Sequence, residues 1–305
     1  MHAIRVRLVR LTASACQRAA RDRQPQSGAC VAPYDPPMAD DALTDFERTT
    51  FTHDGTERDV FRLGTGPAVV VIAAMPGITP KVAQLARRIA GIGCTAVMPH
   101  LFGEPGRDPA PGGKPDLRYT LTSMVPACVS KEFTVWATGR TSPVIGWLRA
   151  LAREEHERCG GPGVGASGMC FTGGFALAMA TDERLLAPVL SQPSMPLALT
   201  RSRKATIDIS AEDLAVVKQR CAAGLEVLGM RFRSDRLVPS ERFRFLEQEL
   251  GDAFRAIELD EGDANPESKL PAHSVVTEHL VDEPGQPTRQ ALDDVLDLFR
   301  TRLLT

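Results

Sequence analysis

The sequence predicts an α/β fold, a mostly parallel sheet with helices on both faces. Three observations predict it. Residues 68–74 are continuously apolar and of strand length, as a strand covered on both faces must be. Residues 80–92 then repeat apolar side chains at a helical period, and residues 94–98 form a second short apolar run. This strand, helix, strand order is typical of a parallel sheet.

The other elements follow along the chain. Asp54-Gly55 lies between the β-prone residues 49–52 and 59–62, which indicates a hairpin. Residues 101–141 are rich in glycine and proline, so we expect loops there with at most one short helix. Strands and helices then alternate: helix 142–157, strand 164–167, helix 175–181, strand 186–190, helix 210–222, strand 225–232, helix 239–250, strand 254–259 and an amphipathic helix over 290–303.

Composition excludes several classes of protein. Of the 305 residues 43% are apolar and 24% are charged, which excludes global disorder, a collagen and a coiled coil. A net charge of -2 offers no basic field for nucleic acid. The longest apolar run, residues 68–75, is far shorter than the roughly 20 residues that span a bilayer, so we expect no membrane partner. Seven cysteines without a CxxC pair indicate free thiols and a cytoplasmic protein.

Residues 1–37 differ from the rest of the chain. They hold six arginines against two acidic residues, and residues 33–37 are rich in proline. The arginines interrupt every apolar run, so a secretory signal fits poorly, while the composition is compatible with an organelle transit peptide. We expect a disordered tail, or an extension upstream of a true start at Met38, followed by one domain over residues 38–305.

The densest motif is the glycine-rich stretch GVGASGMCFTGG at residues 163–174, for which three interpretations compete. Gly163, Gly165 and Gly168 match the dinucleotide fingerprint, but that motif needs a preceding strand and an acidic residue about 20 positions further on. A charged helix end precedes the motif here, and Pro188 stands where the acid should be. We therefore expect no nucleotide cofactor, and no metal-ligand spacing predicts a metal.

The second interpretation is a nucleophile elbow, in which glycines two positions before and after the nucleophile relieve crowding on a sharp turn. Ser167 does not fit, because Met169 follows at the second place. Cys170 has Gly168 on its leading side, although Thr172 stands where the trailing glycine is usual. The third interpretation, a buried inert cysteine in glycine-rich packing, is the ordinary one for the other cysteines.

Residues 168–174, GMCFTGG, resemble the nucleophile motif of the dienelactone hydrolase family, whose members are α/β-hydrolases with a triad of cysteine, acid and histidine. Residues 73–80 and 97–102 resemble the family's segments after its first apolar strand and at the end of the next. The resemblance covers about residues 50–303, apart from 101–141. It implies an α/β-hydrolase fold and cofactor-independent hydrolysis of a small ester, lactone or related carbonyl compound.

The resemblance also implies which residues form the site. In this fold the triad runs in the order nucleophile, acid, histidine, each at the C-terminal end of a strand. Cys170 would be the nucleophile, and Asp235 the acid just beyond its strand. Asp260 and Asp263 lie one strand too late for that role. His273 would be the base, between the last strand and the last helix.

Two further expectations complete the site. The backbone N–H groups of Phe171 and Met75 would form the oxyanion hole. Of the two nearby histidines, His273 lies in a loop-like segment, whereas we expect His279 to pair with the acidic Asp282-Glu283 on the surface.

The sequence departs from the family at three places. Ala74 stands where family members have a glutamate that contacts the resting thiol, His100 where an aspartate is common, and Thr172 where glycine is common. An alternative function is therefore a non-catalytic or thiol-redox-sensing member that binds a small ligand. The sequence leaves a homo-oligomer open.

Overall fold

The computed structural model of the protein describes residues 40–305, apart from 130, 131, 134–138 and 269. The extension expected over residues 1–37 lies outside the described residues. An eight-stranded sheet forms the centre of the domain, in the order β1-β2-β4-β3-β5-β6-β7-β8. Strand β2 runs antiparallel to β1 and β4, and every other neighbouring pair is parallel. The α/β fold with a mostly parallel sheet is confirmed.

The elements have the following bounds. The strands are β1 (Glu47–His53), β2 (Thr56–Gly64), β3 (Ala68–Ile72), β4 (Thr95–Pro99), β5 (Val164–Met169), β6 (Leu185–Ser191), β7 (Val227–Phe232) and β8 (Phe254–Leu259). The α-helices are α1 (Pro80–Gly91), α2 (Leu117–Val129), α3 (Val144–Cys159), α4 (Phe175–Met179), α5 (Arg201–Lys204), α6 (Ala211–Ala222), α7 (Ser240–Leu250) and α8 (Pro287–Leu303).

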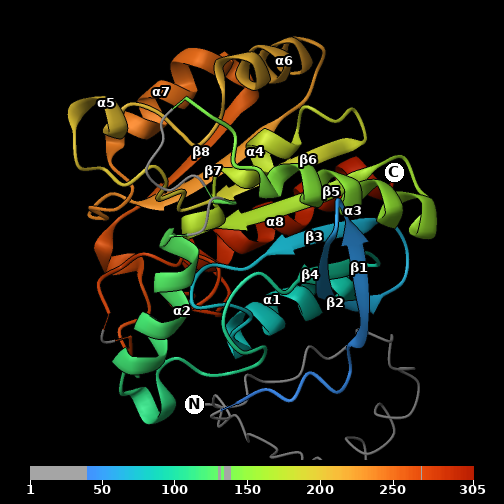
Figure 1. Ribbon diagram of the computed structural model, residues 1–305. Helices are drawn as coiled ribbons and strands as arrows, with labels where there is room; N and C mark the ends of the chain where they lie inside the picture. Colours follow the sequence, from blue (N-terminus) through green and yellow to red (C-terminus); the bar gives the residue numbers. More distant parts are fainter. Residues whose placement is uncertain (1–39, 130–131, 134–138, 269) are drawn as a thin grey trace, which may run out of the picture. The chain divides into compact units, whose positions relative to one another are not determined.

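Two hydrophobic cores lie on opposite faces of the sheet. Helices α1 and α8 contribute to one of them, and α3, α4 and α7 to the other. Figure 1 shows α3 in front of the sheet and α8 behind it. Strand β3 is buried throughout, because its side chains alternate between the two cores: Val69 and Val71 face one, Val70 and Ile72 the other. Because both faces of β3 are buried in this way, residues 68–72 are continuously apolar in the sequence.

One helix is longer than expected and another was not expected. Helix α2 has 13 residues within the stretch predicted as loops with at most one short helix. Asp116 starts it, because its carboxylate accepts the N–H of Tyr119 at 2.9 Å. The four-residue helix α5 lies in the connection between β6 and α6. Among the described residues, no helix is both long and apolar enough to cross a membrane.

Candidate active site

The centre of the site is a sharp turn between β5 and α4. Cys170 follows β5 directly and has a φ of +53°, in the left-handed region that side chains other than glycine rarely adopt. Strand β5 ends on the side of the sheet where α2 lies (Figure 1). The neighbouring glycines make the turn possible, because a Cβ on Gly168 would lie 2.2 Å from the Thr172 carbonyl oxygen. A Cβ on Gly173 would lie 2.4 Å from the Cα of Pro193. Cys170 lies on this turn as a partly exposed residue.

Asp235 and His273 meet at the same end of the sheet. Asp235 lies in the turn after β7, where its side chain is 4% exposed, and His273 lies in the loop between β8 and α8. The distance from Asp235 Oδ2 to His273 Nδ1 is 2.6 Å. Asp235 Oδ1 accepts the backbone N–H of Leu237 at 2.9 Å, which fixes the orientation of the carboxylate. Since Nδ1 donates to Asp235, the other ring nitrogen, Nε2, is free for chemistry.

The imidazole of His273 and the thiol of Cys170 shift each other's pKa. Burial favours the neutral form of both groups, but their mutual attraction and their hydrogen bonds outweigh it. The pKa of His273 rises to about 10, helped by the hydrogen bond to Asp235. The pKa of Cys170 falls below 9.0, helped by the Ser194 hydroxyl and the Phe171 N–H. The pair is therefore biased towards thiolate and imidazolium.

Other cysteines behave in the opposite way. Burial raises the pKa of Cys94 to about 11, and it also raises the pKa of Cys221. Because the thiolate is the nucleophilic form, Cys170 is the reactive thiol of these three.

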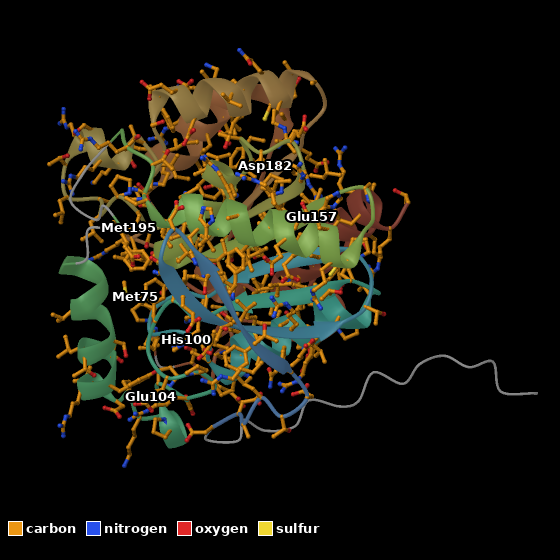
Figure 2. The ribbon with its side chains drawn as sticks, turned by 45° about the vertical axis from the view of Figure 1, so that its right-hand side comes forward. Met75, His100, Glu104, Glu157, Asp182 and Met195 are labelled. Atoms are coloured by element: carbon orange, nitrogen blue, oxygen red, sulfur yellow. The ribbon has the colours of Figure 1, made fainter. Side chains whose placement is uncertain are left out.

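The N–H groups expected to bind an oxyanion lie on adjacent strand ends. Strands β3 and β5 are parallel, and Ile72 pairs with Gly168. Met75 follows β3 and Phe171 follows β5, so both backbone segments leave the sheet at the same edge. Figure 2 shows Met75 and Met195 on the side of the domain where α2 lies.

Residues 59–220, more than half of the chain, match the sequence model of the dienelactone hydrolase family. The chain belongs to the dienelactone hydrolase family. It is accordingly an ester or lactone hydrolase by family. A search of curated protein sequences found no match.

Solved structures show the same fold. A dienelactone hydrolase candidate from Klebsiella pneumoniae subsp. pneumoniae is 17% identical, with a TM-score of 0.55, covering 83% of this chain and 97% of that one. A dienelactone hydrolase from Anabaena variabilis is 14% identical, with a TM-score of 0.52 and coverage of 85% and 99%. A dienelactone hydrolase-like promiscuous phosphotriesterase from metagenomic libraries is 15% identical, with a TM-score of 0.50 and coverage of 85% and 98%. The α/β-hydrolase fold is confirmed.

Thr172 replaces the glycine common in the family and gains hydrogen bonds in exchange. Its side chain is fully buried. The hydroxyl oxygen accepts the N–H of Met169 at 3.0 Å and donates to the carbonyl of Ile72 at 2.9 Å. Thr172 thus ties the elbow to the end of β3, the strand that leads to Met75.

The other two departures from the family have different consequences. Ala74 carries no carboxylate, so no acid from that loop contacts the thiol. His100 follows β4, and its Nε2 lies 2.8 Å from the Gly103 carbonyl, which it bonds within its own loop.

The expectation for His279 was wrong. The side chain is buried, and its Nδ1 accepts the N–H of Ser274 at 3.1 Å. The proton then sits on Nε2, which lies 3.2 Å from the Leu270 carbonyl. Asp282 is instead bound by Arg88 and Arg289. His279 is buried because its ring forms hydrogen bonds with the backbone of the loop that carries His273. The acidic residues that follow it in the sequence had suggested a surface ion pair instead.

Two further residues, Ser194 and Arg242, lie at the site without having been expected there from the sequence. Ser194 Oγ lies 3.5 Å from the Cys170 sulfur. Arg242, on α7, is fully buried and donates to the carbonyls of Pro193 and Pro196, at 2.7 and 2.5 Å. The sequence does give one indication for Ser194, which is its position just after a predicted parallel strand. Functional side chains of such sheets lie at the C-terminal ends of the strands. Among the described residues, no group of three or more histidines, cysteines and acids could hold a metal.

Proposed function

We propose that the protein hydrolyses small carboxylic esters or lactones, with Cys170 as nucleophile, His273 as base and Asp235 as the residue that orients the base. The observation that carries the proposal is the 2.6 Å contact from Asp235 to His273, together with the charge coupling of His273 to a cysteine on a strained elbow. Perturbed pKa values in such a cluster are typical of functional sites.

The chemistry proceeds in two halves. The Cys170 thiolate attacks the carbonyl carbon, and the N–H groups of Phe171 and Met75 stabilise the negative oxygen that forms. The intermediate collapses to a thioester as the alcohol leaves with a proton from His273. His273 then takes a proton from water, the hydroxide attacks the thioester, and the carboxylic acid leaves as the thiolate re-forms. For a lactone, alcohol and acid are the two ends of one product.

Buried aromatic rings pack around Phe171, the residue that follows the nucleophile. The rings of Phe102 and Phe133 each meet the Phe171 ring edge-on, with a centroid distance of 5.7 Å in both cases. Apolar side chains beside the nucleophile exclude water and strengthen the electrostatic interactions in the site.

The test is multiple turnover of p-nitrophenyl acetate by the full chain. Cys170→Ala should abolish turnover, because no other group in the site can form the thioester. Cys221→Ala is the matched control and should keep wild-type kcat, since burial suppresses ionisation of that thiol. Activity that survives in Cys170→Ala and is lost in Ser167→Ala would instead identify a serine enzyme and refute the proposal.

A second candidate function follows from Ala74. Without an acid in that loop, a partly exposed cysteine whose thiol has a lowered pKa also suits a redox sensor or a ligand-binding protein. A single stoichiometric burst of p-nitrophenol, with Cys170 left acylated, would favour this candidate over the enzyme.

A further inference from the structure

Ser194 lies against the nucleophile from the next strand of the sheet. It comes after β6 and is 5% exposed. Its N–H donates to the Cys170 carbonyl at 2.9 Å, and its hydroxyl oxygen lies 3.5 Å from the Cys170 sulfur. Serine and cysteine therefore meet through both backbone and side chain. Within the described part of the chain, this hydroxyl has no hydrogen-bond partner other than the sulfur.

We infer that Ser194 is a positioning residue, whose hydroxyl donates a hydrogen bond to the Cys170 thiolate and holds the sulfur on the elbow. The inference rests on the proposed function, in which Cys170 is the nucleophile. In family members a glutamate in the loop after β3 contacts the resting thiol, and this chain has Ala74 at that place. Here Ser194, which follows β6, makes the contact with the sulfur instead.

The hydroxyl suits this role because it is buried and, among the described residues, has no other hydrogen-bond partner. A buried hydroxyl without a partner destabilises a protein, so its contact with sulfur is a requirement of the fold as well as of the site. A donor that faces an ionised acceptor forms a stronger hydrogen bond than one that faces a neutral acceptor. The contact therefore favours the thiolate over the thiol.

Arg242 holds the segment that carries Ser194. Its guanidinium donates to the carbonyl before Ser194, on Pro193, and to a carbonyl two residues after it, on Pro196. It also donates to the carbonyls of Thr206 and Arg203, at 2.8 and 2.9 Å. On the other side, the N–H of Gln192 donates to the Met230 carbonyl of β7 at 2.7 Å. Ser194 is thus fixed from both directions, which a positioning role requires.

The experiment measures the ionisation of Cys170 directly. The full-length protein is alkylated with iodoacetamide across a range of pH, and the rate at Cys170 is followed by peptide mass mapping. Ser194→Ala should raise the pH midpoint of alkylation by about one unit, the size expected when a charged group loses one hydrogen bond. The kcat for p-nitrophenyl acetate should fall about tenfold at neutral pH with little change in KM.

Two variants serve as comparisons. Ser202→Ala, an exposed serine of α5 in the same connection, should keep the wild-type midpoint. Ser194→Thr keeps a hydroxyl and should also stay near the wild-type midpoint. An unchanged midpoint in Ser194→Ala would overturn the inference, even if melting temperature dropped, because it would show a structural role alone. Equal shifts in Ser194→Thr and Ser194→Ala would overturn it as well.

The alkylation result does not depend on ester turnover. A shifted midpoint in a protein that turns over no ester would refute the proposed function and support the role of Ser194. An unshifted midpoint in an active esterase would refute the role of Ser194 alone.

Discussion

Cys170 combines a strained backbone with a reactive side chain. A residue other than glycine in the left-handed region costs on the order of 1–3 kcal/mol and persists only where its surroundings enforce it. Here they do, because the Cys170 carbonyl accepts the N–H groups of Gly173 and Ser194, both at 2.9 Å. The strain places the sulfur at the end of the sheet rather than inside it.

The two histidines of the last loop should respond differently to removal. His273→Ala should lower kcat/KM by about 10²–10⁴-fold, because the general base is lost. The variant should still fold, although it leaves the buried Asp235 carboxylate without its partner and so lowers the melting temperature as well. His279→Ala should lower the melting temperature by several degrees, since it leaves the Ser274 N–H unpaired in the interior.

Steady-state kinetics and circular dichroism melts on the same preparations check this pair. His53→Ala, in the β1–β2 hairpin, is the control and should change neither quantity. A folded but inactive His279→Ala beside a near wild-type His273→Ala would require a different base.

At the scale of elements, Thr172 joins two strands at the elbow. Thr172→Val keeps the shape but removes a donor and an acceptor, so the Met169 N–H and the Ile72 carbonyl each lose a partner. We expect the free energy of unfolding to fall by about 1–3 kcal/mol, measured by urea denaturation. Thr52→Val, on the exposed face of β1, should change it by less than about 0.5 kcal/mol. Equal stability of the two variants would contradict a role for Thr172 as a strand tie.

The spacing of apolar residues in the sequence predicted most of the helices and strands. Where that prediction fell short, the structure shows the physical reason. The buried strands β3 and β4 stand out as apolar runs in the sequence, because both their faces are covered. Helix α2 gives a weaker signal, because its apolar residues Leu117, Leu121 and Val125 are exposed rather than turned into a core. In such a helix, burial does not select the pattern on which the prediction depends.

The part of the candidate site that depends on the order of strands along the chain was predictable from the sequence. The part that depends on contacts between segments far apart in the sequence was not. Cys170, Asp235 and His273 each follow a strand that the sequence reveals, so the shared edge of a parallel sheet brings them together. No local pattern in the sequence links Ser194 to Arg242, which lies a full strand and two helices further on. Their contact depends on the path of an irregular loop.

At the scale of the whole domain, a buried carboxyl group makes stability depend on pH. Burial raises the pKa of Asp208 to about 7, although the Ser142 hydroxyl and the Arg242 charge oppose the shift. Ser142 Oγ lies 2.8 Å from Asp208 and 2.9 Å from the Phe133 carbonyl. The single hydroxyl proton can serve one of them, so a protonated Asp208 can donate to Ser142 while Ser142 donates to Phe133.

The sign of the dependence follows from proton uptake. Between about pH 4 and pH 7 the folded chain binds a proton at Asp208 that the unfolded chain releases, so this group's contribution to stability falls as pH rises through that window. Asp208→Asn removes the titration. Its melting temperature relative to wild type should therefore rise by several degrees from pH 5 to pH 8.

Differential scanning calorimetry at both pH values measures the change. Asp252→Asn, an exposed carboxylate, is the control. A constant difference between Asp208→Asn and wild type across the range would show that Asp208 is ionised throughout.

The strand order has a consequence for self-association. With β1 and β8 outermost, each leaves one row of backbone groups unpaired by strands of the sheet, and such rows invite aggregation through added strands. Both strands carry charges: Arg48 pairs with Asp59 at 2.7 Å, and Arg255 with Glu226 at 3.0 Å. Docking another strand there would bury these ions at an energetic cost. Assembly of copies by a continuous sheet is therefore disfavoured.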